Sequence, residues 1–262
     1  MRIALLADIH GNELALNAVL RDIEARGGVN AYWILGDLVA LGPQPVRVLE
    51  TLSELPNTRF VRGNTDRYVV SGDRPSPSIE EAKSNFELMG ALVEVANTFA
   101  WTQGMITAGG WLPWLHELPV EMRIELPNGT RFLGVHASPG RDDGSGIGPH
   151  MNAAEISPLL QDCAADLVCI GHTHCPFEYR VDGIHVVNPG AVSLSVTADK
   201  GASYLLLDTA EKGYSVHHYS VPYDRAAVID QLNRLQHPGR GYLIKHLSDH
   251  DSDERQRAMH SL

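Results

Sequence analysis

Aspartate, asparagine and histidine side chains recur in this sequence directly after short apolar runs. Seven such residues stand in five segments: Asp8 and His10 follow residues 2–7, Asp37 follows 31–35, Asn64 follows 59–61, His136 follows 130–135, and His172 and His174 follow 167–170. Carboxylate oxygens and imidazole nitrogens are ligands that divalent transition metals accept. Because open α/β sheets place their ligand sites at the carboxyl ends of the strands, we expect all five segments to meet in one metal site.

The seven side chains suit two metal ions, since the two oxygens of one carboxylate can bridge two cations. Glycines at positions 11, 36, 63 and 171 permit tight turns beside them. Two divalent ions bring +4 and the carboxylates of Asp8 and Asp37 bring −2, which leaves +2, or +1 once a bound water loses a proton. This local charge attracts a phosphate group although the chain carries a formal net charge of −11.

The composition of the 262 residues excludes several function classes. With 21 Lys and Arg against 32 Asp and Glu, the chain lacks the basic surface that binds long nucleic acids or membranes. No stretch approaches the roughly 20 apolar residues of a membrane span. The three cysteines form no CxxC motif, and the apolar start ends at Asp8, too early for a signal sequence. We therefore expect a cytoplasmic protein with neither a membrane partner nor a long nucleic-acid partner.

Apolar runs and helical patterns alternate along the first part of the chain. Strands are predicted at 2–7, 31–35 and 59–61 and helices at 13–25 and 44–54, the order of a layered α/β fold. Further helices are predicted at 79–107, 153–163 and 224–235, and further strands at 120–126, 130–135, 167–170 and within 177–220. No linker or repeat interrupts the sequence. We predict one domain, 1–262, with a helical insertion at 79–119 and a polar, frayed tail at 246–262.

The motifs, taken together, resemble those of a known family. Asp8-x-His10, Gly36-Asp37, Gly63-Asn64, Gly134-Val135-His136 and Gly171-His172-Thr173-His174 stand in the order typical of the calcineurin-like metallophosphoesterases. The resemblance covers residues 2 to about 208. The insertion and Asn188-Pro189-Gly190 resemble the bacterial and archaeal branch of YfcE-like phosphodiesterases. This resemblance implies two mixed β-sheets packed face to face with helices outside, a four-layer α-β-β-α sandwich.

The resemblance also implies a ligand set and a reaction. The first metal would be held by Asp8, His10, Asp37 and His174, and the second by Asp37, Asn64, His136 and His172, so that Asp37 is the bridge. The expected enzyme is a metal-dependent phosphoric ester hydrolase in which a metal-bridging hydroxide attacks phosphorus. The ligand types allow manganese, iron, nickel, zinc or cobalt, among which we expect manganese. Asn64 and His136 stand near the phosphoryl oxygens in this scheme.

One position departs from the family pattern. Many members carry histidine after the Gly-Asn motif, where this chain has Thr65, followed by Asp66. That histidine commonly assists the leaving group, so its role cannot be transferred to Thr65. We therefore expect the rate to depend strongly on the basicity of the leaving group.

The substrate is expected to be a small phosphorylated compound, and branch resemblance favours a phosphodiester. A phosphomonoester and a dinucleoside polyphosphate are alternatives on the same fold. A non-catalytic interaction scaffold is an alternative of another class, since a eukaryotic retromer subunit resembles the same branch. A nuclease of the same superfamily is a further alternative, and the negative net charge argues against it because long nucleic-acid strands are also negative. The sequence leaves the oligomeric state open.

Several residues near the motifs have both a functional and a structural interpretation. Asn12, Arg62, Asp66 and Arg67 are candidate substrate-binding residues. Alternatively, Asn12 and Asp66 are helix caps and the two arginines are solvated. The tryptophans at 101, 111 and 114 either form a lid for a flat group or pack within the helical insertion. The polar loop at 141–143 either borders the substrate or faces solvent.

Overall fold

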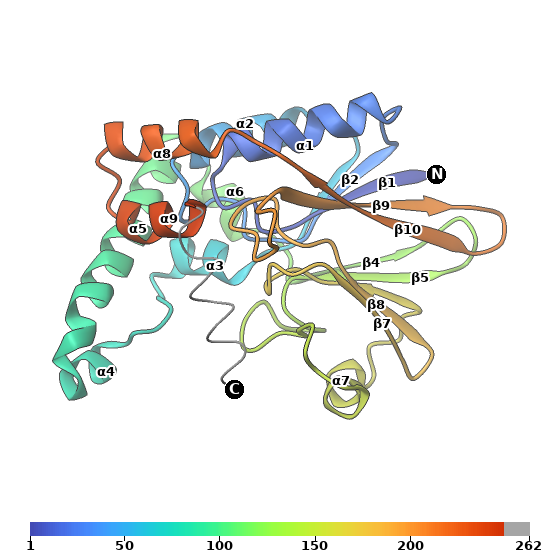
Figure 1. Cartoon of the computed structure of the whole chain (residues 1–262). Coiled ribbons are helices and arrows are strands. Elements are labelled where there is room, and N and C mark those ends of the chain that lie inside the picture. Colours follow the sequence, from blue (N-terminus) through green and yellow to red (C-terminus); the bar gives the residue numbers. More distant parts are fainter. Residues whose placement is uncertain (249–262) are drawn as a thin grey trace.

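Two five-stranded β-sheets lie face to face in this protein, whose computed structural model describes residues 1–248 (Figure 1). The first sheet has the order β10-β9-β1-β2-β3, with bounds Tyr214–Val221, Ala202–Thr209, Arg2–Leu6, Ala31–Ile34 and Thr58–Phe60. The second has the order β4-β5-β6-β8-β7, with bounds Glu121–Glu125, Arg131–Val135, Leu167–Cys169, Ile184–Asn188 and Phe177–Val181. Both sheets mix parallel pairs, such as β1 with β2 and β5 with β6, with antiparallel ones. This is the predicted pair of mixed sheets.

The burial of strand β1 on both faces explains why residues 2–7 form a continuous apolar run. Ile3 and Leu5 point into the core between the two sheets, where they meet side chains such as Phe132. Ala4 and Leu6 point the other way, into the core under the helices. Both faces of the strand are therefore buried, which removes the polar positions that a half-exposed strand would show.

Helices cover the outer face of each sheet and complete four layers (Figure 1). Helices α1 (Glu13–Ala25) and α2 (Pro45–Glu54) lie on the first sheet, and α7 (Ala153–Leu160) lies on the second. Helix α1 buries Leu16, Val19 and Ile23, which are spaced three and four residues apart. The four-layer sandwich predicted from the sequence is confirmed.

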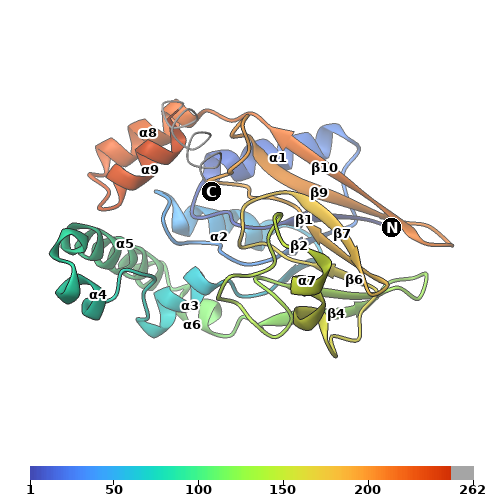
Figure 2. The ribbon, with the colours of Figure 1, turned by 60° about the horizontal axis from the view of Figure 1, so that its bottom comes forward.

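The remaining helices gather at one end of the sandwich, beyond the carboxyl ends of the parallel strands. They are α3 (Asn64–Ser71), α4 (Ile79–Ser84), the short 3₁₀ helix η1 (Phe86–Leu88), α5 (Met89–Ala108), α6 (Leu112–His116), α8 (Arg225–Arg234) and α9 (Arg240–Leu247). Figure 2 shows α4 and α5 on one side of this end and the pair α8–α9 on the other. Within residues 1–248, no helix is both long and apolar enough to cross a membrane.

One detail of the predicted elements is corrected by the structure. The helices predicted within 79–107 are confirmed as α4, η1 and α5, with a break at Asn85, whose side chain accepts the N–H of Glu87. The frayed tail predicted from 246 begins too early, because α9 continues to Leu247 and buries Leu243 and Leu247 against α8. The rest of that predicted tail, 249–262, lies outside the described residues.

Candidate metal centre

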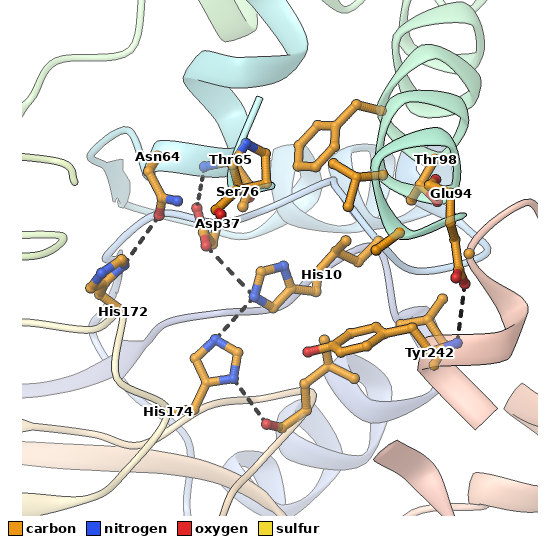
Figure 3. A pocket seen from close by; sticks show the side chains of 18 residues that line it. His10, Asp37, Asn64, Thr65, Ser76, Glu94, Thr98, His172, His174 and Tyr242 are labelled. Carbon is orange, nitrogen blue, oxygen red and sulfur yellow. Dashed lines mark hydrogen bonds and ion pairs between the residues drawn. The ribbon is translucent and has the colours of Figure 1, made fainter. Parts of the chain in front are cut away.

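All seven predicted ligand residues come together at the end of the sandwich that carries the extra helices. Asp8 and His10 follow β1, Asp37 follows β2, Asn64 opens α3, His136 follows β5, and His172 and His174 follow β6. Figure 3 shows five of these side chains directed toward one another. Two groups have ligand atoms all within 4.8 Å of one another: Asp8, His10 and His174, and Asp8, Asp37 and His136.

The loops that carry these side chains have an uncommon backbone. Asp8, His10, Asp37, His172 and His174 have positive φ angles between 48° and 68°. Non-glycine residues adopt this left-handed region only when the surrounding structure imposes it, and such residues concentrate at functional sites. Hydrogen bonds between loops supply the constraint, since Asp8 N–H donates to Gly36 O at 3.1 Å and His10 N–H to Asp37 O at 2.9 Å.

Gly63 is required by the close approach of two of these loops. A Cβ atom at this position would lie 2.1 Å from Asp37 Oδ1 and 2.3 Å from Asp37 N. Any side chain would therefore displace the Asp37 carboxylate.

The four histidines are oriented by carbonyl groups of the backbone. One ring nitrogen of each lies close to a carbonyl oxygen: His10 Nδ1 to Ala40 at 3.1 Å, His136 Nδ1 to Leu35 at 2.7 Å, His174 Nδ1 to Leu194 at 2.9 Å, and His172 Nε2 to Gly144 at 2.8 Å. Because a carbonyl oxygen only accepts, each of these nitrogens carries the hydrogen. When such a ring is neutral, its other nitrogen presents its lone pair to the centre, as in histidine metal ligands.

The contact between His10 and His174 shows that this donor set fits a cation. Their two Nε2 atoms are 3.1 Å apart (Figure 3). Since both Nδ1 atoms carry hydrogen, two lone pairs would face each other if both rings were neutral. Burial opposes protonation of His174, but Asp8 outweighs it and raises the His174 pKa, so either a proton on His174 or a metal ion between the two nitrogens makes the contact favourable.

The two carboxylates lie between the histidines. Asp37 Oδ2 is 3.6 Å from His10 Nε2 and 3.5 Å from His136 Nε2, and Asp8 Oδ1 is 3.4 Å from His174 Nε2. Asn64 Oδ1 is 3.1 Å from both His136 Nε2 and His172 Nδ1. Oxygen and nitrogen acceptors thus surround one small volume.

The electrostatics of the site favour positive charge at its centre. Burial opposes ionisation of Asp8 and Asp37, but the neighbouring His174 and His136 outweigh it and lower both carboxyl pKa values. Burial also opposes protonation of His136, yet Asp37 and Asp8 raise its pKa to about 10. At His10 burial prevails and lowers the pKa to about 4. The pair of buried carboxylates therefore stabilises cationic neighbours.

Asn12 and Asp66 have structural partners within the protein. Asn12 is buried, and its Oδ1 accepts the N–H of Ala15 at 3.1 Å, which caps α1. Asp66 is fully buried, and its two oxygens accept Leu38 N–H at 2.9 Å and Gly63 N–H at 3.0 Å. Asp66 therefore ties the Asp37 loop to the start of α3, and both side chains have the cap role that the sequence offered as an alternative.

The side chains of Arg62 and Arg67 form ion pairs within the protein. Arg62 Nε donates to Asp142 at 2.8 Å, and Arg67 contacts Asp142 at 3.2 Å and Asp143 at 2.7 Å. Ion pairs with the 141–143 loop therefore hold both arginines in place, and the solvated alternative is wrong for them. This loop is not merely solvated, because Gly144, which follows it, accepts the hydrogen bond from His172.

A cavity of about 410 Å³ adjoins the ligand cluster, and its outer walls were not predicted. Glu94 and Thr98 of α5 and Tyr242 of α9 line it (Figure 3). The sequence analysis did not predict helix α9, and the apolar pattern of α5 did not indicate that it lines a cavity. The spacing of Leu243 and Leu247, four residues apart, is a sequence signal that indicates α9.

The tryptophans do not form a lid over this cavity. Trp114 packs edge-on against Phe60 and Trp111, with ring centroids 5.1 and 5.8 Å apart. Trp101 packs against His237 at 4.4 Å. Trp111 and Trp114 therefore pack within the helical insertion as the alternative stated, whereas Trp101 packs against a residue outside it.

Comparisons with known proteins agree with this geometry. The profile of the calcineurin-like phosphoesterase superfamily domain matches residues 1–212. An uncharacterized protein of Methanocaldococcus jannaschii is 29% identical over 250 residues, which cover 89% of this chain and 93% of that protein. A metallophosphoesterase structure from Sphaerobacter thermophilus is 28% identical with a TM-score of 0.72 and covers 94% of this chain and 98% of that one.

A hypothetical protein of Pyrococcus horikoshii shares the fold, with a TM-score of 0.77 at 21% identity over 94% of this chain and 97% of that one. The profile match extends from β1 to the end of β9 and includes every predicted ligand residue. The chain belongs to the calcineurin-like phosphoesterase superfamily.

Proposed function

We propose that this protein is a dinuclear metal-dependent phosphoesterase that hydrolyses a phosphodiester. The observation that carries the proposal is the inward-facing set of acceptors, above all the two Nε2 atoms of His10 and His174 at 3.1 Å. In neutral rings these two nitrogens are both acceptors, and a shared cation, either a metal ion or a proton, removes their repulsion.

The proposed ligand sets share one carboxylate. Asp8, His10, Asp37 and His174 hold the first ion, and Asp37, Asn64, His136 and His172 hold the second. The position of Asp37 Oδ2, 3.6 Å from His10 and 3.5 Å from His136, supports its assignment as the bridge. When bound, the two ions supply a hydroxide at neutral pH and polarise the phosphoryl oxygens.

The protein's own residues prepare the site for that chemistry. Asp8 and Asp37, which are ionised, offset half of the charge of two divalent ions and leave a net +2 that attracts an anionic phosphate. Carbonyls of Ala40, Leu35 and Leu194 fix three of the histidine rings, so the ligands need little reorganisation when ions bind. The nitrogen-rich set supports manganese, iron, nickel, zinc or cobalt over magnesium alone, and we propose manganese.

Elemental analysis of the purified protein tests the metal assignment. We expect two divalent ions per wild-type chain, and loss of ions and turnover in Asp37→Asn, because the amide replaces the bridging carboxylate. Asp166→Asn is the matched control, since Asp166 lies at the opposite end of β6 in an exposed pair with Arg131. Full activity and metal content in Asp37→Asn would refute the assignment.

A substrate panel tests the reaction. Phosphodiesters, phosphomonoesters and dinucleoside polyphosphates are assayed with Mn, Fe, Ni, Co, Zn and Mg. We expect phosphodiesters to show the highest kcat/KM. A protein that retains no ions and hydrolyses none of these compounds would be a scaffold on the same fold.

A further inference from the structure

The cavity beside the ligand cluster has two chemically different ends. Its inner end is formed by metal-ligand candidates such as His10, Asp37 and Asn64. Its outer walls come from α5 and α9, which lie on opposite sides of this end of the molecule (Figure 2). A volume of about 410 Å³ is within the range of small-molecule sites.

The outer walls are largely apolar. Ala91, Val95 and Phe99 lie four residues apart on one face of α5, and Leu243 of α9 faces the same space. Within residues 1–248, no lysine or arginine lines the cavity. The one acidic group on these outer walls is Glu94, whose Oε1 accepts the N–H of Tyr242 at 3.2 Å and so connects the two walls.

A hydroxyl group marks the boundary between the two ends. Thr65 lines the cavity, and its Oγ1 is buried without a hydrogen-bond partner among the described residues. Its N–H is bound to Asp37 Oδ1 at 2.9 Å, which places the residue beside the proposed bridging ligand. A buried hydroxyl without a partner loses free energy unless an occupant of the cavity bonds to it.

We propose that the α5–α9 cavity binds an uncharged, largely apolar organic group of the phosphoester substrate, while the phosphate lies at the metal ligands. This inference rests on the proposed function and adds the substrate class. Apolar walls gain free energy by burying such a group. Among residues 1–248, the outer walls offer no cation to a second phosphate or a carboxylate on this group, which would meet the carboxylate of Glu94. The cavity therefore disfavours dinucleoside polyphosphates and selects esters of apolar or aromatic alcohols.

Equilibrium binding of phosphonates tests the proposal without turnover. Methylphosphonate, phenylphosphonate and 4-carboxyphenylphosphonate are titrated calorimetrically into the manganese-loaded full chain. We expect phenylphosphonate to bind at least tenfold more tightly than methylphosphonate, and the added carboxylate to remove that advantage. Glu94→Lys is expected to restore tight binding of 4-carboxyphenylphosphonate by replacing repulsion with attraction.

A pair of variants on α5 provides the structural control. Ala91→Asp places a charge in the apolar wall and is expected to weaken phenylphosphonate binding at least fivefold while leaving methylphosphonate binding unchanged. Ala100→Asp, at an exposed position of α5 outside the cavity, is expected to change neither. Both alanines are exposed, so neither substitution disrupts the core.

The outcomes separate the two proposals. Equal affinity for methyl- and phenylphosphonate, or no selective effect of Ala91→Asp, would overturn the assignment of the cavity and leave the metal centre intact. Absence of methylphosphonate binding by the manganese-treated protein would overturn the proposed function itself, and with it this inference.

Discussion

The position of Thr65 leads to a quantitative prediction about the leaving group. Thr65 departs from the family pattern described above, which has a histidine here; its N–H is bound to Asp37 and its hydroxyl is unpaired among the described residues. A threonine hydroxyl can donate a hydrogen bond but cannot give up its proton near neutral pH. The departing alkoxide is therefore not protonated by this residue, and we expect hydrolysis to slow as the leaving group becomes more basic.

The size of the effect follows from the contribution of a general acid, which is roughly 10²–10⁴-fold in rate. Across aryl phosphodiesters whose phenols span about 3 pKa units, we expect the wild-type rate to fall by roughly 10²–10³-fold. Thr65→His should raise the rates of the esters with the most basic phenols and so flatten the slope of log rate against the pKa of the leaving phenol. Thr65→Val should lower every rate about tenfold without changing the slope, because the variant cannot offer the bound phosphate the hydrogen bond of about 1.5 kcal/mol that the unpaired hydroxyl can donate.

The assay is the single-turnover rate of each ester at saturating manganese, so that chemistry limits the rate. Thr65→Val is the control for altered packing, since it keeps the shape of the side chain. A flat dependence in the wild-type protein would show that another group donates the proton. An unchanged slope in Thr65→His would show that position 65 is not on the leaving-group side.

Three further substitutions test the structural assignments. Asn12→Ala removes the α1 cap and a hydrogen bond to Ser193, and it should lower the free energy of unfolding by about 2 kcal/mol without changing KM. A raised KM at unchanged stability would instead support a contact between Asn12 and the substrate. Phe132→Ala, between the sheets, should cost about 3–5 kcal/mol in urea unfolding, and a loss below about 1 kcal/mol would contradict its core position. Burial lowers the pKa of His237 from 6.5 to about 4, so the folded protein stays neutral there while the unfolded chain takes up a proton, and stability falls as the pH drops through this range. His237→Phe should reduce that fall by at most about 3 kcal/mol, whereas identical pH profiles of unfolding would show that His237 titrates normally.

The residue pattern predicted a layered α/β fold and all seven residues of the ligand cluster, and the two-sheet sandwich came from the resemblance to the calcineurin-like metallophosphoesterases. The residue pattern depends on local signals: a strand buried on both faces needs an apolar run such as 2–7, and a tight turn after it needs residues such as Gly36 next to Asp37. Because the carboxyl ends of neighbouring strands meet at one edge, the position of a residue along its strand already placed it in the site.

Only the tertiary structure decided which polar residues serve the fold and which face the cavity. Asp66 and Leu38 are 28 residues apart, and Glu94 and Tyr242 are 148 apart, so no local pattern announces either bond. A carboxylate has the same chemistry in both places. Its role depends on the backbone N–H groups or the empty volume that folding brings to it, and distant segments of the chain supply both.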